Sequence, residues 1–351
     1  MLVVGCWEGR DVPSPAANKS GRSADRYAQD GKHRGMNVVA RSAVSPADLE
    51  SLLVDNVEWI ALGPFGWQDG LRSPTVHMNT EMGFWGERDA GIIQIANVAH
   101  ARGMHVLLKP QLWLRHGNRD GWLDAIDPGS PDGWAEWFGA YDAFILHYAA
   151  LAETCGIEVF CVGAELHTAV TQHPEAWRAL IDRVRSIYHG RLTYAANWHE
   201  EVSDVSFWDA LDFIGVQAYY PLADGPNPSV EAMMHAWKPV CASLEALSGR
   251  YKKPVLFTEV GWKSTADGAV RPWEWTEFGS GNTAPSLDLQ ADAYEAFFRS
   301  VWPEPWFAGA YFWKWYTERG HNPGMQNVDF TPQRKPAEAV LARGYGRLPS
   351  S

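Results

Sequence analysis

The chain of 351 residues lacks any long apolar run. No stretch approaches the roughly 18 consecutive apolar residues that a transmembrane helix needs, so we expect no membrane-spanning segment. The chain also lacks an excess of basic residues, since 30 Lys and Arg stand against 42 Asp and Glu, for a net charge of −12. An acidic chain repels phosphate backbones, which argues against nucleic acid as a partner.

Cysteine is scarce as well. The four cysteines, Cys6, Cys155, Cys161 and Cys241, have spacings that match no zinc or redox motif. The histidines are scattered and show no metal-ligand spacing either. We therefore expect free thiols, no metal site and no cofactor.

The first part of the chain has no hydrophobic periodicity. Residues 8–35 are rich in Ser, Gly, Pro and charge, which predicts a flexible segment over residues 1–34 and a single domain over 35–347. The sequence VVGC at residues 3–6 resembles the cleavage box of a bacterial lipoprotein signal, although the basic region and most of the apolar region of such a signal are missing. We therefore expect a truncated signal followed by a linker, and either an extracytoplasmic or a cytoplasmic protein.

Aromatic residues are abundant. The chain has 19 Trp, 14 Phe and 12 Tyr, together 13% of its residues. Flat, uncharged rings bury large areas, and they can stack on the C–H face of a pyranose. The composition therefore favours a carbohydrate ligand.

From residue 35 onward, short β-branched runs alternate with helical stretches, which is typical of repeated βα units. Strands are predicted at 36–40, 57–62, 105–109, 158–162, 192–195, 213–217, 255–258 and 310–314. Helices are predicted near 46–55, 89–102, 134–154, 174–188, 204–210, 229–248, 288–301 and 333–343. Eight strands in steady alternation, with no glycine-rich phosphate loop after the first, favour a single closed (β/α)8 TIM barrel over an open doubly wound sheet.

In such a barrel, functional residues follow the C-terminal ends of the strands. The polar and aromatic side chains found there are candidate substrate-binding residues: Trp67, Lys109, Gln111, Trp113, Asn197, Trp198, Gln217, Tyr219, Trp262 and Trp313. Each has an ordinary alternative in packing or in satisfying loop backbone groups, and for Lys109 the alternative is an ion pair. The long loop at 261–285, with Trp273 and Trp275, is expected to form a wall of the cleft.

Two glutamates also follow predicted strands, Glu165 after the fourth and Glu259 after the seventh. In an eight-stranded ring these positions lie across the same opening. A pair of carboxylates in a groove is what a glycosidase needs, because one acid protonates the leaving oxygen and a second carboxylate stabilises or attacks the oxocarbenium-like centre.

Several segments around these glutamates resemble glycoside hydrolases of clan A. Within that clan they are most similar to family 113, whose characterised members are chiefly β-1,4-mannanases. The resemblance is carried by FCVGAEL at 160–166, LTYAANW at 192–198, FWDALDFIG at 207–215, KPVLFTEVG at 253–261, AYFW at 310–313 and FTPQRKPAE at 330–338. It covers nearly all of the predicted domain.

The resemblance implies roles for four residues. Glu165 would be the acid/base and Glu259 the nucleophile of a retaining mechanism. Trp313 would be the platform under the sugar at subsite −1, and Tyr219 would hydrogen-bond the nucleophile. One position departs from the clan, since Ala164 stands where most members have an Asn that binds the sugar 2-hydroxyl.

We therefore expect a monomeric retaining glycoside hydrolase that cleaves a β-linked polysaccharide or oligosaccharide, with β-1,4-mannan first. Its two carboxyl groups should lie about 5–5.5 Å apart. The alternatives are an exo-β-mannosidase, a β-glucanase of the same clan, and a barrel that binds carbohydrate without turnover.

Overall fold

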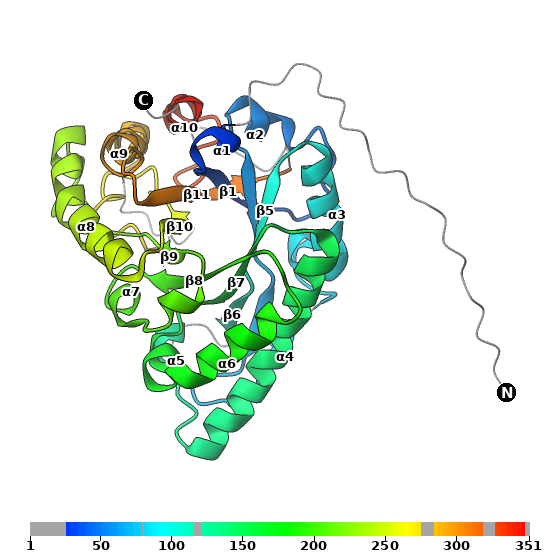
Figure 1. Ribbon diagram of the computed structural model, residues 1–351. Helices are drawn as coiled ribbons and strands as arrows, with labels where there is room; N and C mark the ends of the chain where they lie inside the picture. Colours follow the sequence, from blue (N-terminus) through cyan, green and yellow to red (C-terminus); the bar gives the residue numbers. More distant parts are fainter. Residues whose placement is uncertain (1–25, 79, 116–120, 275–283, 319–326, 348–351) are drawn as a thin grey trace.

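A closed barrel of eight parallel strands forms the centre of the molecule. The computed structural model describes residues 26–78, 80–115, 121–274, 284–318 and 327–347. Neighbouring strands follow the order β1-β11-β10-β9-β8-β7-β5-β2, and helices surround them (Figure 1). The barrel strands are β1 (His33–Val39), β2 (Trp59–Leu62), β5 (His105–Leu108), β7 (Val159–Ala164), β8 (Arg191–Asn197), β9 (Ile214–Gln217), β10 (Val255–Val260) and β11 (Phe307–Tyr316). Each predicted strand overlaps one of these, and the predicted TIM barrel is confirmed.

The helices also follow the predicted alternation. The longer ones are α3 (Asp89–Ala101), α4 (Pro131–Cys155), α6 (Pro174–Arg185), α8 (Val230–Tyr251), α9 (Leu287–Ser300) and α10 (Pro336–Gly346). The shorter ones are α1 (Tyr27–Asp30), α2 (Glu50–Val54), α5 (His167–Gln172), α7 (Glu201–Asp204) and the 3₁₀ turns η1 (Trp85–Glu87), η3 (Leu123–Ala125) and η4 (Trp208–Ala210). In the described part of the chain, no helix is both long enough and apolar enough to cross a membrane.

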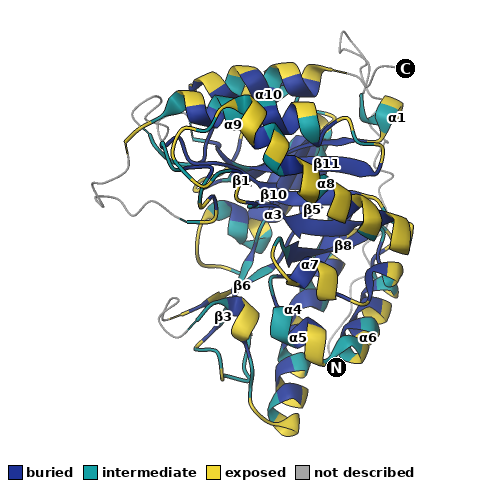
Figure 2. Ribbon diagram, turned by 90° about the vertical axis from the view of Figure 1, so that its left-hand side faces the viewer, coloured by how far each residue is buried: buried dark blue, intermediate teal, exposed yellow. Residues whose placement is uncertain are grey.

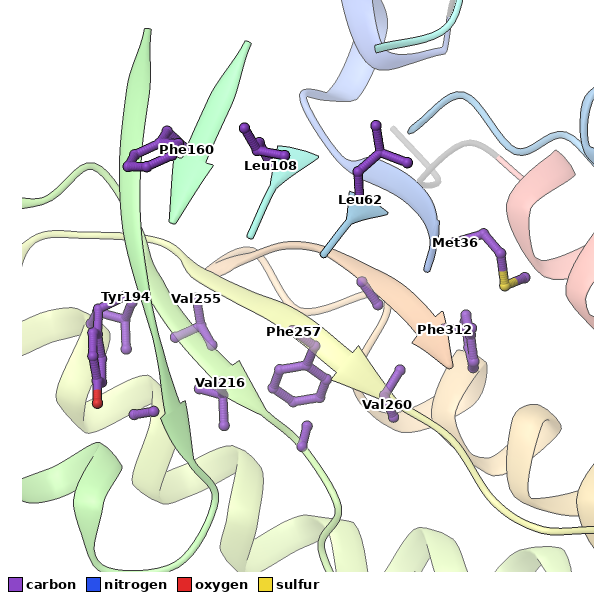
Figure 3. Close-up of a cluster of buried hydrophobic side chains, with 14 of the residues drawn as sticks. Met36, Leu62, Leu108, Phe160, Tyr194, Val216, Val255, Phe257, Val260 and Phe312 are labelled. Carbon is purple, nitrogen blue, oxygen red and sulfur yellow. The ribbon is translucent and has the colours of Figure 1, made fainter. Parts of the chain in front are cut away.

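The core has two parts, because side chains of a strand alternate between its faces. On β7, Phe160 and Val162 join the large cluster between barrel and helices, whereas Val159 and Cys161 belong to a smaller cluster inside the barrel. Figure 3 shows members of the outer cluster, among them Phe160 and Phe257. In Figure 2 the barrel strands are buried and the exposed residues lie on the outer faces of the helices.

The folded chain begins before the predicted boundary at residue 35. Helix α1 precedes β1, and Arg34, which is fully buried, pairs with Asp30 at 2.7 Å. The backbone N–H groups of Arg26 and Tyr27 donate to the Glu58 carboxylate. These polar residues were assigned to a linker because the sequence does not reveal their partners, which lie across the fold. The rest of the predicted flexible segment, residues 1–25 with the lipoprotein-like box, lies outside the described residues.

The N-terminal ends of the strands are sealed by aromatic rings, and we call this cluster the floor: Tyr27, His33, Trp59, His105 and Tyr311. The ring of His33 stacks on Trp59 with centroids 3.8 Å apart, and Trp59 stacks on His105 at 4.5 Å. Tyr27 of α1 meets Trp59 edge-on. The floor therefore closes one end of the barrel, and the C-terminal strand ends, which we call the mouth, form the other.

A three-stranded sheet beside the mouth was not predicted. It consists of β3 (Phe65–Gln68), β4 (His77–Met78) and β6 (Gln111–Leu114), with β3 parallel to β6 and antiparallel to β4. Figure 2 shows β3 and β6 to one side of the barrel. These strands have four residues or fewer, and they follow β2 and β5 so closely that the sequence offered only loops there.

Candidate active site

The small sheet presents one aromatic face to a cleft at the mouth. Because side chains alternate, Phe65 and Trp67 of β3 share a face with Gln111 and Trp113 of β6, and the register pairs Phe65 with Gln111 and Trp67 with Trp113. All four line the cleft. The opposite face packs on α4, where Trp137 donates to Gln68 at 2.9 Å. The alternating sequence of β3 and β6 thus builds a wall suited to sugar rings.

A second aromatic wall comes from different loops. Trp198, after β8, stacks with Trp273 of the long loop after β10, with ring centroids 5.3 Å apart. Trp273 is 41% exposed, as expected for a ring at the rim of a groove. Trp275 of the same loop lies outside the described residues. The cleft bounded by these walls has a volume of 1170 Å³.

Glu165 stands directly after β7, in a left-handed conformation with φ of 54°. Such a conformation is uncommon for a residue other than glycine, and the residue lines the cleft. The side-chain amide of Asn197 donates to its Oε1 at 2.8 Å, and the indole of Trp122 also hydrogen-bonds its carboxylate. Burial and the nearby charge of Glu259 raise the pKa of Glu165 to about 7, against the effect of these hydrogen bonds.

Glu259 lies on β10 and is 6% exposed. Its Oε2 accepts a hydrogen bond from the Tyr219 hydroxyl at 2.7 Å. Its Oε1 pairs with the ammonium group of Lys109, which in turn donates to Gln217 Oε1 at 3.1 Å. Burial raises the pKa of Tyr219 well above its usual value, so the phenol remains a donor to the carboxylate. These two contacts hold both carboxylate oxygens of Glu259 in place.

Trp313 of β11 also lines the cleft. Its ring has the ammonium groups of Lys109 and Lys314 at 5.9 and 5.7 Å from its centroid. The close approach of β10 and β11 depends on Gly261, because a Cβ there would lie 2.6 Å from the Trp313 carbonyl oxygen. The half-buried ring keeps a face toward the cleft that it lines.

The structure brings most of the predicted site residues together. Those that line the cleft are Glu165, Glu259, Trp67, Gln111, Trp113, Asn197, Trp198, Gln217, Tyr219 and Trp313. Two predicted binders are placed elsewhere. Trp262 is 1% exposed and packs between Trp237 and Tyr294, because its side chain faces the helices. Lys109 is 1% exposed and forms an ion pair with Glu259, which is the ordinary alternative that the sequence analysis gave for this lysine.

Sequence reasoning missed Phe65, Trp122 and the aromatic rim residue Phe84, which also line the cleft. Phe65 and Phe84 carried no chemical signal of their own. Trp122 follows a segment without strand or helix pattern, so nothing in its surroundings placed it next to Glu165. For metal, the described residues hold no group of three or more His, Cys, Asp or Glu that is placed to bind an ion.

A carboxyl group with a raised pKa and a second carboxylate held by Lys109 and Tyr219 share one aromatic cleft of a TIM barrel, which is the arrangement of a two-carboxylate glycoside hydrolase. The comparison with family models agrees. The chain belongs to glycoside hydrolase family 113, whose model matches residues 34–335.

Solved structures of that family are similar over nearly their whole length. A family 113 β-mannanase from Alicyclobacillus acidocaldarius, solved in complex with ManMIm, is 31% identical with a TM-score of 0.77, and the alignment covers 90% of this chain and 97% of that one. A complex of a family 113 β-1,4-mannanase is 29% identical with a TM-score of 0.75, covering 90% and 99%. A β-glucuronidase from Faecalibacterium prausnitzii, 12% identical, shares the fold alone. Comparison with curated proteins gives no match.

Proposed function

We propose that this glycoside hydrolase cleaves β-1,4-linked mannan and mannooligosaccharides within the chain, with retention of configuration. The choice of substrate rests on the similarity to a β-mannanase and a β-1,4-mannanase, each at about 30% identity over nine-tenths of this chain. Internal cleavage is supported by the cleft, since 1170 Å³ exceeds the roughly 300–1,000 Å³ of ordinary small-molecule sites. Such a groove has room for several sugar rings.

In this mechanism, Glu259 is the nucleophile. Its carboxylate attacks the anomeric carbon while the glycosidic C–O bond breaks, and a covalent glycosyl–enzyme forms. Lys109 and Tyr219 hold one carboxylate oxygen each, which fixes the side chain for attack. We expect the carboxyl groups of Glu259 and Glu165 to lie about 5–5.5 Å apart in the working enzyme.

Glu165 is the acid/base. In the first step its proton moves to the leaving glycosidic oxygen, which a pKa of about 7 allows at neutral and mildly acidic pH. Formation of the glycosyl–enzyme removes the charge of Glu259, so Glu165 becomes a stronger acid and remains ionised. In the second step it takes a proton from water as the water oxygen attacks the anomeric carbon and releases Glu259. The two steps together hydrolyse the glycosidic bond, and the two inversions at the anomeric carbon give net retention of configuration.

The remaining cleft residues bind the sugar. Trp313 offers a platform for the C–H face of the pyranose at the point of cleavage, since its ring lies beside Lys109. The walls with Trp67, Trp113 and Trp198 serve neighbouring rings, and Gln111 and Gln217 offer amides to hydroxyls.

A product time course on mannohexaose, set beside cellohexaose, tests the proposal. Internal cleavage of mannan predicts a mixture of short products from mannohexaose and none from cellohexaose. Release of mannose alone, from one end, would indicate an exo-β-mannosidase, and products from cellohexaose alone would indicate a β-glucanase. The anomer formed first, followed by NMR, reports retention.

A further inference from the structure

A buried carboxyl group that does not line the cleft lies directly behind the acid/base. Glu201, the first residue of α7, is 2% exposed. Its Oε1 is 2.5 Å from the hydroxyl oxygen of Tyr194, which is fully buried on β8. Its Oε2 accepts the backbone N–H of Asn197 at 2.6 Å. A buried carboxyl group is costly unless its oxygens are hydrogen-bonded, and here both are.

These contacts continue to Glu165 in two directions. On one side, Asn197 donates its side-chain amide to Glu165 Oε1 at 2.8 Å. The orientation of that amide is fixed, because Asn197 Oδ1 accepts the backbone N–H of His199 at 3.1 Å, and so the NH₂ group must face Glu165. On the other side, the Tyr194 hydroxyl accepts the backbone N–H of Leu166, the residue after Glu165, at 2.7 Å.

The hydrogen bonds therefore close a ring that runs from Glu165 through Asn197, Glu201 and Tyr194 to Leu166. Glu201 is the member that joins the end of β8 to the end of β7. It holds the backbone of the residue that hydrogen-bonds the acid/base, and through Tyr194 it holds the backbone next to the acid/base itself. Glu165 has a left-handed backbone, which persists only where the surrounding structure holds it, and this ring of hydrogen bonds holds the residues on either side of the contact.

We propose that Glu201 is a positioning residue for the acid/base, and that it acts on proton transfer to the leaving group through Asn197 and Tyr194. The proposal rests on the assignment of Glu165 as acid/base. Positioning of a catalytic group contributes to rate through geometry, so loss of Glu201 should weaken the step that needs the proton and spare steps that do not. A residue that only stabilises the fold would affect all substrates alike.

The test compares two substrates in kcat/KM, which reports the first chemical step. Mannotetraose has a sugar leaving group that needs protonation, whereas dinitrophenyl β-mannobioside has a leaving group that departs without it. We expect Glu201→Leu to lose about 10–100-fold on mannotetraose and less than about threefold on the aryl substrate. Glu201→Gln should restore part of the loss, because its amide oxygen can accept the Asn197 N–H and its NH₂ can donate to the Tyr194 oxygen, although the Tyr194 O–H then loses the acceptor that Glu201 Oε1 provides.

Three further variants make the result decisive. Glu158→Leu removes a carboxylate that accepts the Val106 N–H at 2.9 Å at the floor, and it should lower the melting temperature without separating the two substrates.

Tyr194→Phe cuts the ring while keeping the hydrogen bond from Asn197 to Glu201. It should show the same separation to a smaller degree, and it decides the matter if Glu201→Leu does not fold. Equal losses on both substrates, or no loss, in these ring variants would overturn the proposal. Glu165→Ala is the reference, because absence of the separation there would instead refute the assignment of the acid/base.

Discussion

The two ends of β7 hold two glutamates in opposite electrostatic settings. Glu158 precedes the strand at the floor and Glu165 follows it at the mouth. Although burial works against it, hydrogen bonds from His100, His105 and the Val106 N–H lower the pKa of Glu158 to about 2. At the other end, burial and the charge of Glu259 raise the pKa of Glu165 to about 7.

The difference follows from the number of donors and from what faces each carboxyl group. Glu158 accepts hydrogen bonds from three donors, which stabilise its charge, and this charge contributes to the stability of the fold. Glu165 faces Glu259 across a cleft, and its charge is therefore disfavoured until that neighbour is neutralised. The barrel thus carries a carboxylate with a lowered pKa at one end and, at the other, a carboxyl group with a raised pKa, which is the one proposed to react.

The largest expected effect is loss of the mouth carboxylates themselves. Glu259→Ala should reduce kcat on the order of 10⁴-fold or more, and Glu165→Ala by about 10²–10⁴-fold on unactivated substrates. With azide and an activated β-mannoside, Glu259→Ala should give the α-azide, because azide replaces the nucleophile in a single inversion. Glu165→Ala should give the β-azide, because azide attacks the covalent intermediate. Products identified by NMR in the reverse pattern would exchange the two roles.

The sequence predicted the parts of this contrast that depend on strand order. Glu165 and Glu259 could be placed at one opening because each follows a run with clear strand periodicity, and barrel topology brings such ends together. Contacts between segments far apart in the chain could not be predicted from the sequence. Lys109 forms an ion pair with Glu259 across the barrel. Trp262 is buried against Trp237 and Tyr294 on the helix side of the barrel. Glu201 follows no strand end, so only the folded chain reveals its place behind Glu165.

The second largest effect concerns pH. Because the acid must be protonated, and because its pKa is raised to about 7, kcat/KM should fall about tenfold per unit above pH 7. The same shift predicts a stability change of definite sign. Between the ordinary carboxyl range and pH 7 the folded state holds the proton better than the unfolded state, so Glu165 penalises the fold as pH rises through that window.

Glu165→Gln removes this titration. Relative to the parent, the variant should gain thermal stability between pH 5 and pH 8 in calorimetric scans. Glu158→Gln is the opposite case, since a lowered pKa stabilises the fold above the ordinary carboxyl range and is lost as pH falls toward 2. Its stability deficit should therefore be present at pH 5 and shrink on acidification. Parallel pH profiles of the two variants would show that the two ends do not differ as described.

The third prediction separates two tryptophans that the sequence treated alike. Trp313→Ala should cost about 10–100-fold in kcat/KM, because stacking a sugar on the ring is worth on the order of 1–3 kcal/mol. Its melting temperature should stay near that of the parent, since the ring is only half-buried. Trp262→Ala is the matched control and should instead lose about 3–5 kcal/mol of folding free energy, because the ring is 1% exposed. A strongly destabilised Trp313→Ala would make that ring structural, and near-full activity would remove it from the subsite.

The smallest effect on activity is expected at the floor. Glu58 accepts the backbone N–H groups of Arg26 at 3.0 Å and Tyr27 at 3.1 Å, which ties α1 across the end of the barrel. Glu58→Ala should cost about 1–3 kcal/mol, the usual value of hydrogen bonds to a charged group, and lower the melting temperature by a few degrees. Its kcat/KM on mannotetraose should match the parent, as should that of Glu136→Ala, a control at an exposed position of α4 that should also melt like the parent. If Glu58→Ala lowers turnover while the melting temperature is unchanged, the floor is coupled to the chemistry at the mouth, and the division between a stabilising end and a reactive end does not hold.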